Sequence, residues 1–91
     1  MNIEELHVSS LIVYVRPEKS SHIGGNINAL AGAELITMTE HGKAIVILEA
    51  ASQKQIMRSI ESINALDGVL HTGLVYHEFQ QSTQNNSEEV T

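Results

Sequence analysis

The sequence contains no cysteine, a single proline and only three aromatic residues, two tyrosines and one phenylalanine. Without cysteine, the chain has no disulfide framework, no thiolate metal ligand and no cysteine nucleophile. The shortage of aromatic rings leaves Ile, Val, Leu and Met to form the core. It also leaves few platforms on which nucleic-acid bases stack.

Positive charge is scarce as well, because five Lys and Arg residues stand against eleven Asp and Glu residues and give a formal net charge of −6. Such a charge opposes nucleic acid and anionic membranes and favours a basic partner. The longest wholly apolar run, residues 44–48, is far shorter than the roughly 20 residues that span a bilayer. The first residues lack the basic segment of a secretory signal peptide. We therefore expect a cytoplasmic protein that makes no stable association with membranes and binds no nucleic acid.

A length of 91 residues allows one domain. Residues 80–91 contain one aliphatic side chain, Val90, among Gln, Ser, Thr, Asn and Glu, and this composition is typical of disorder. The sequence predicts a single domain over residues 1–79 and a disordered polar tail over residues 80–91.

A short repeat organises the chain. The segment INALAGA at residues 27–33 returns 36 positions later as INALDGV at residues 63–69. In each copy an apolar helical stretch is followed by a Gly, which can adopt the left-handed conformation that ends a helix. Apolar runs precede both helices, so each half is predicted to fold as strand, helix, strand.

The predicted strands cover residues 6–15, 33–39, 43–50 and 69–77 or 69–79. The first helix, residues 18–30, has an apolar stripe formed by Ile23, Ile27 and Leu30. The second helix is capped by Ser52, and its stripe comprises Ile56, Met57, Ile60, Ile63 and Leu66. This order predicts the ferredoxin-like βαββαβ fold of the α+β class. Right-handed crossovers would give strand order 4-1-3-2, with both helices on one face of the sheet.

The other face of this sheet would be uncovered, yet it is more apolar than a solvated face. In the third strand Ala44, Val46 and Leu48 can face the helices, but the opposite parity still carries Ile45 and Ile47. The fourth strand is ambiguous, and we assign its bulkier parity to the core: Leu70, Thr72, Leu74 and Tyr76. His71, Gly73, Val75 and His77 would then face outwards. The candidate site on the uncovered face comprises Val8, Ser10, Ile12, Ile45, Ile47, Glu49, Gly73 and Val75.

Such an apolar patch with charges at its rim marks either a homodimer interface or a platform for a peptide. Small residues at its centre would let a helix approach closely. Glu34, Glu40 and Glu49 would lie near enough to hold basic side chains.

Catalytic and metal-binding patterns are weak. The five histidines lie on different predicted elements without metal-ligand spacing, so we expect surface or edge histidines, no metal site and no cofactor. Ser9 and Ser10 lie within a strand, with no nucleophile motif, and are expected to pack and form hydrogen bonds. No pair of carboxylates is forced together by spacing, and we expect no enzymatic activity.

The chain resembles the NapD family of small cytoplasmic chaperones for the catalytic subunit of periplasmic nitrate reductase. The resemblance covers about residues 6–77. It is carried by VSSLIV at residues 8–13, GAE at 32–34, GK followed by IVILEA at 42–50, IESI at 60–63, and GVL with LVYH at 68–77.

This resemblance implies a ferredoxin-like protein that binds the twin-arginine signal peptide of the nitrate reductase precursor. It further implies that binding delays export until the molybdenum cofactor has been inserted. The alternative hypothesis is a ferredoxin-like regulatory domain that senses a small molecule and acts as a homodimer. A weak homodimer is also compatible with the chaperone hypothesis.

Overall fold

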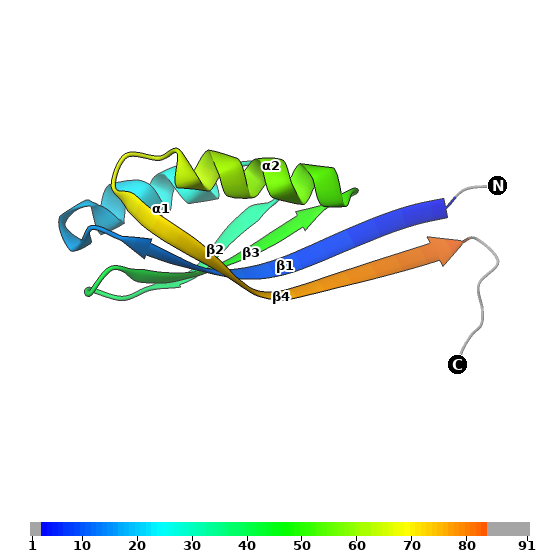
Figure 1. The fold of residues 1–91 in the computed structure, drawn as a ribbon, viewed down its shortest axis with the longest axis horizontal. Helices are drawn as coiled ribbons and strands as arrows, with labels where there is room; N and C mark the ends of the chain where they lie inside the picture. Colours follow the sequence, from blue (N-terminus) through cyan, green and yellow to red (C-terminus); the bar gives the residue numbers. More distant parts are fainter. Residues whose placement is uncertain (1–2, 84–91) are drawn as a thin grey trace.

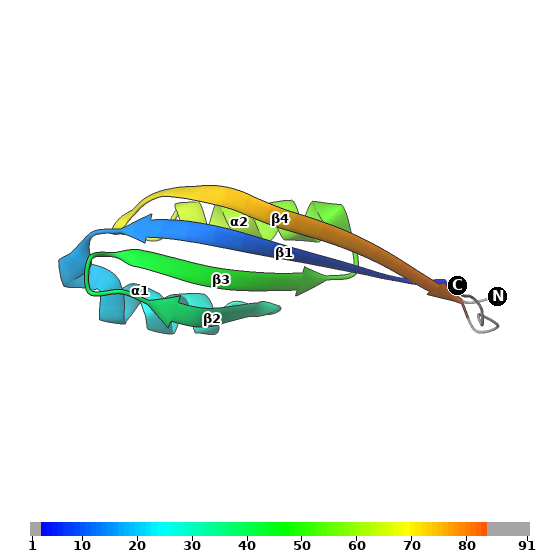
Figure 2. The ribbon, with the colours of Figure 1, turned by 90° about the horizontal axis from the view of Figure 1, so that it is seen from below.

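The computed structural model describes residues 3–83, which form one four-stranded antiparallel sheet with two helices on one side (Figure 1). The strand order is β2-β3-β1-β4, and Figure 2 shows the four strands in this order from the side without helices. The ferredoxin-like fold, strand order and one-sided helices predicted from the sequence are confirmed. The elements are β1 (Ile3–Val15), η1 (Pro17–Lys19), α1 (Ser20–Asn28), β2 (Ala33–Met38), β3 (Lys43–Ala50), α2 (Gln53–Asn64) and β4 (Val69–Thr83).

The sequence repeat is also a structural repeat. Helix α1 ends at Asn28 and α2 at Asn64, the same position of the two copies. Each copy then passes through a glycine with positive φ, 79° at Gly32 and 102° at Gly68. A Cβ on Gly32 would lie 2.3 Å from the carbonyl oxygen of Glu49, so a side chain is excluded there by space as well as by conformation.

The core lies between the sheet and the two helices. Alternate residues of β1 and β3 point into it, because successive side chains of a strand face opposite sides of the sheet. Ser52 accepts a hydrogen bond from the backbone N–H of Gln55 and caps α2, as predicted. The buried apolar residues are Leu11, Val13, Val15, Ile23, Ile27, Ala44, Val46, Leu48, Ile56 and Ile63.

The predicted stripe of α2 is only partly correct. Ile56 and Ile63 are buried, whereas Ile60 and Leu66 are half-buried and pack against the core from its edge. Met57 is 49% exposed and was wrongly assigned to the stripe. The buried arc of α2 is therefore narrower than predicted, because the helix covers the sheet from one side only and no further layer contacts it.

The assignment of β4 to the core is wrong. Leu70, Leu74 and Tyr76 are each more than half exposed, and only Thr72 of the four predicted core residues is half-buried. Strand β4 lies at the edge of the sheet and has a neighbouring strand on one side only. The pairing of β1 with β4 also shifts register between Ser10 and Leu11, which pair with Tyr76 and Leu74. Val75 is the extra residue of this bulge, and beyond it the side chains of β4 change sides.

Strands β1 and β4 continue past the helices as a two-stranded ribbon (Figures 1 and 2). The predicted domain boundary at residue 79 falls within β4, which continues to Thr83 and pairs there with Ile3. Backbone pairing with β1 orders this polar segment, which composition alone assigns to a tail. The rest of the predicted tail, residues 84–91, lies outside the described residues. Within residues 3–83, no helix has the length and apolar character needed to cross a membrane.

Candidate functional site

Where β1 pairs with β3, the sheet face opposite the helices carries four rows of side chains. The rows follow from the strand register, because paired residues point to the same side of a sheet. We call this surface the open face. Its rows, each crossing the sheet, hold Glu49, Val8 and Glu78; then Glu34, Ile47, Ser10 and Tyr76; then Thr37, Ile45, Ile12 and Gly73; and finally Lys43, Tyr14 and His71.

The centre of the open face is apolar. Val8, Ile12, Ile45 and Ile47 are adjacent across β1 and β3, and each is half-buried although no helix covers it. Their partial burial comes from neighbouring side chains on the same face. Ser10 and Gly73 are small, and a Cβ on Gly73 would meet no atom within 4 Å. The centre of the open face is therefore apolar and has room for the side chains of a partner.

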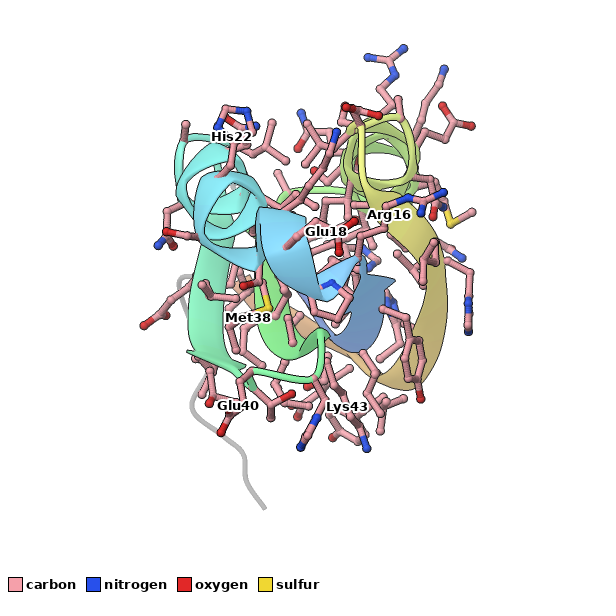
Figure 3. All side chains as sticks on the ribbon, turned by 90° about the vertical axis from the view of Figure 1, so that its left-hand side faces the viewer. Arg16, Glu18, His22, Met38, Glu40 and Lys43 are labelled. Carbon is pink, nitrogen blue, oxygen red and sulfur yellow. The ribbon has the colours of Figure 1, made fainter. Side chains whose placement is uncertain are left out.

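The two ends of the open face differ in charge. Three carboxylates, Glu34, Glu49 and Glu78, belong to the first two rows, and we call this region the acidic end. The opposite end carries Lys43 beside Tyr14, whose ring stacks on His71 with centroids 4.4 Å apart. Figure 3 shows Lys43 and Glu40 at this second end, on the side of the sheet away from the helices.

The structure brings together seven of the eight residues predicted for the site, all but Val75, in the four rows of the open face. Val75 lies in the bulge, is 61% exposed and has no partner in the β1 register. The ring of Tyr76 takes a place on the open face that the sequence assigned to Val75. An isolated Gly within a strand pattern often accompanies a bulge, and Gly73 is the sequence feature that would have indicated this one.

His77 lies on the helix side of the sheet and not on the open face, where the strand pattern placed it. Its Nδ1 is 2.7 Å from the hydroxyl oxygen of the fully buried Ser9, and its Nε2 is 3.3 Å from Nδ1 of His7. His7 is itself buried and lies 3.5 Å from a carboxylate oxygen of Glu5. The burial of His7 differs from the expected surface or edge position, whereas His77 is half-buried on the edge strand β4. Ser9 packs and forms hydrogen bonds as predicted.

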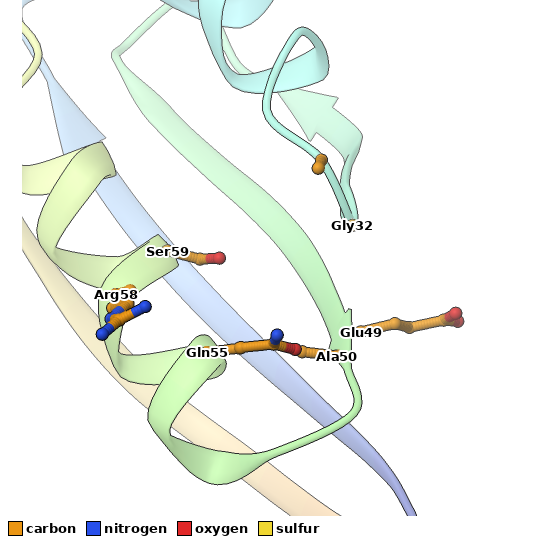
Figure 4. A pocket seen from close by; sticks show the side chains of 7 residues that line it. Gly32, Glu49, Ala50, Gln55, Arg58 and Ser59 are labelled. Carbon is orange, nitrogen blue, oxygen red and sulfur yellow. The ribbon is translucent and has the colours of Figure 1, made fainter.

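Hollows also occur on the helix side of the described part of the chain. One, of about 510 Å³, is lined by Glu5, His7, Gln53, His77 and Phe79. Another, of about 330 Å³, lies between α2 and the loop after α1 (Figure 4). In Figure 4 Gln55 extends from α2 towards Ala50 at the end of β3, while Glu49 points away from α2. The carboxylate of Glu49 therefore belongs to the open face and not to this hollow.

Among residues 3–83, no group of three or more His, Cys, Asp or Glu side chains is arranged to hold a metal ion. The open face presents apolar side chains with carboxylates at one end, an arrangement suited to binding an apolar and basic surface.

Comparison with known proteins shows the family of the chain. The sequence model of the family described as NapD protein matches residues 6–81. The chain belongs to the NapD family. Chaperone NapD of Haemophilus influenzae is 36% identical over 85 residues, which cover 92% of this chain and 89% of that protein. The homologues are named as chaperones and not as enzymes.

A solved structure supports the same assignment. The solution structure of the Escherichia coli Tat proofreading chaperone protein NapD matches with a TM-score of 0.75 and 33% identity, covering 94% of this chain and 90% of that one. A transcriptional regulatory protein of the ASNC family from Pyrococcus furiosus matches with a TM-score of 0.61 at 18% identity, over 91% of this chain and 55% of that one. At this identity the second match shows a shared fold alone, and it adds no support for a regulatory function.

Proposed function

We propose that this NapD-family chain is a cytoplasmic chaperone that binds the twin-arginine signal peptide of the periplasmic nitrate reductase precursor on its open face. Binding would keep the precursor from export until its molybdenum cofactor has been inserted. The cofactor in this proposal belongs to the client enzyme. The observation that carries the proposal is the combination of an uncovered apolar centre with carboxylates at one end of the same face.

The apolar centre supplies the main attraction. Burying about five apolar side chains of a peptide contributes on the order of 7 to 15 kcal/mol. The loss of translational freedom and the ordering of the peptide cost a similar amount. The free energy of apolar contact therefore roughly offsets the cost of association. The charge interactions then decide whether the peptide binds with measurable affinity.

The carboxylates supply that charge. Glu34 and Glu49 are exposed on neighbouring strands, next to the apolar centre. Guanidinium groups form bidentate, charge-assisted hydrogen bonds with carboxylates, and a lysine ammonium cannot reproduce that geometry. A peptide with two arginines followed by an apolar segment matches both parts of the open face.

Calorimetric titration with a synthetic twin-arginine signal peptide tests the proposal. We expect micromolar or tighter binding, weakened about tenfold when both arginines are replaced by lysines. A scrambled peptide of the same composition is the matched control and should bind much more weakly. Absence of binding by the twin-arginine peptide, or equal binding by the scrambled peptide, would refute the proposed function.

The delay of export has its own test in cells that cannot make the molybdenum cofactor. With the chain present, the precursor should remain in the cytoplasm, and without it the empty precursor should reach the periplasm. Equal periplasmic amounts of precursor in the two strains would contradict the delay while leaving peptide binding intact.

A further inference from the structure

The open face is polarised along its strands. Its acidic end carries Glu34, Glu49 and Glu78, whereas at the other end the charge of Lys43 is offset by Glu40 in the β2–β3 turn. The charge gradient therefore runs along β1, from Val8 towards Tyr14, and not across the sheet.

The size of the face makes this gradient relevant to a peptide. The four rows are two residues apart along β1, about 7 Å per step, so the face is about 20 Å long. A helix of about 13 residues has the same length. One bound segment can therefore contact the acidic end and the Lys43 end at once.

A signal peptide carries its positive charges before its apolar segment. Resting on the function proposed above, we propose that the peptide binds in one direction, parallel to β1. Its arginines then contact the acidic end, and its apolar segment crosses Ile12 and Ile45 towards Tyr14. The reverse direction would place the arginines at the end where the charges of Lys43 and Glu40 offset each other. It would also leave the carboxylates of Glu34 and Glu49 under apolar side chains, where loss of water is unfavourable.

The helix dipole acts in the same sense. A peptide bound as a helix directs the positive end of its dipole, the N-terminus, to the carboxylates of the acidic end. Its C-terminus then lies near the ammonium group of Lys43. Side-chain charge and backbone dipole thus favour one direction together.

Paramagnetic NMR measures this direction. The full chain contains no cysteine, so a nitroxide can be attached to a cysteine added at either end of the twin-arginine peptide and to nothing else. The N-terminal label should broaden the amide signals of Val8, Ile47 and Glu49. The C-terminal label should broaden those of Tyr14 and Lys43. The chemically reduced, diamagnetic label is the control for each peptide.

The results of this experiment distinguish a failure of the proposed peptide direction from a failure of the proposed function. A reversed pattern, or equal broadening by both labels, overturns the orientation while the open face remains the binding site. A bound peptide that broadens only signals of α1 or α2, or a peptide that does not bind, overturns the proposed function.

A matched pair of charge reversals gives a second measure of direction. Glu49→Lys and Glu40→Lys make the same change of charge at opposite ends of the face. We expect Glu49→Lys to weaken peptide binding about tenfold or more and Glu40→Lys to weaken it less than about threefold. An equal or larger loss in Glu40→Lys contradicts the proposed direction.

Discussion

The two faces of the sheet are built from the same strands but differ in what covers them. On the helix side, Val13, Ala44 and Val46 are fully buried by α1 and α2. On the open side, Ile12, Ile45 and Ile47 are equally apolar, yet no element of residues 3–83 covers them. The helix side shows what folding requires of these strands, and the apolar surplus on the open side indicates a requirement for binding.

The largest expected difference between the faces comes from placing an aspartate on each. Val46→Asp puts a carboxylate in the core and should cost roughly 4 kcal/mol or more, enough to unfold a small domain. Ile47→Asp, one residue further on, places its carboxylate on the open face, where it can still contact water in the free protein and becomes fully buried only in the complex. It should keep the fold and abolish peptide binding, as measured by circular dichroism and calorimetry. If Ile47→Asp unfolds the protein, Ile47 belongs to the core and the assignment of the two faces is inverted.

Side-chain truncations in α2 test which residues of this helix pack into the core. Ile63→Ala should cost about 2 to 5 kcal/mol in urea unfolding, because Ile63 is fully buried. Ile60→Ala should cost about 1 to 2 kcal/mol, because the half-buried Ile60 loses less contact with the core. Equal losses in the two variants would show that the buried arc of α2 is wider than described.

Two neighbouring residues of β4 test the bulge on the open face. Tyr76→Ala removes a ring from the row of Ser10 and should weaken peptide binding about fivefold, within the range for an aromatic contact at the edge of an interface. Val75→Ala removes a side chain without a place in the β1 register and should change binding less than twofold. A larger effect at Val75 than at Tyr76, again by calorimetry, would restore the strand parity predicted from the sequence.

The smallest effect is expected away from both faces, where Lys19 of η1 hydrogen-bonds Asp67 in the loop before β4. This bond and the positive charge of Lys19 hold the pKa of Asp67 below its usual value. Because the folded state lowers this pKa, the pair adds stability above the pKa of the unfolded chain. That stability is lost as pH falls through the folded value.

Asp67→Asn should therefore show a slightly smaller fall in urea midpoint between pH 7 and pH 3 than the parent chain. The carboxylate is exposed, so the difference should be small and should shrink with added salt. A larger fall in the variant would contradict the assigned direction of the pKa.

Local patterns were sufficient to predict the fold. The repeat ending in Gly32 and Gly68 and the stripe through Ile56 and Ile63 each depend on neighbours along the chain, and these features appear in the structure where expected. The alternation in β1 and β3 likewise placed most of the candidate site on one face.

Features that depend on pairing between distant segments were not predicted. The bulge at Val75 depends on how β4 pairs with β1, and it reverses the sides of Tyr76 and His77. The extension of β4 to Thr83 depends on backbone hydrogen bonds with β1, to which side-chain composition gives no guide. The burial of His7 follows from its contact with His77, 70 positions away.

Mapping of amide chemical shifts during titration with the twin-arginine peptide is the most direct test that the open face binds it. The account predicts that the largest changes fall in β1 from Val8 to Tyr14, in β3 from Lys43 to Glu49, and at Gly73 and Tyr76 of β4, with small changes in α1 and α2. Changes concentrated in the helices, with those three strands unaffected, would contradict it.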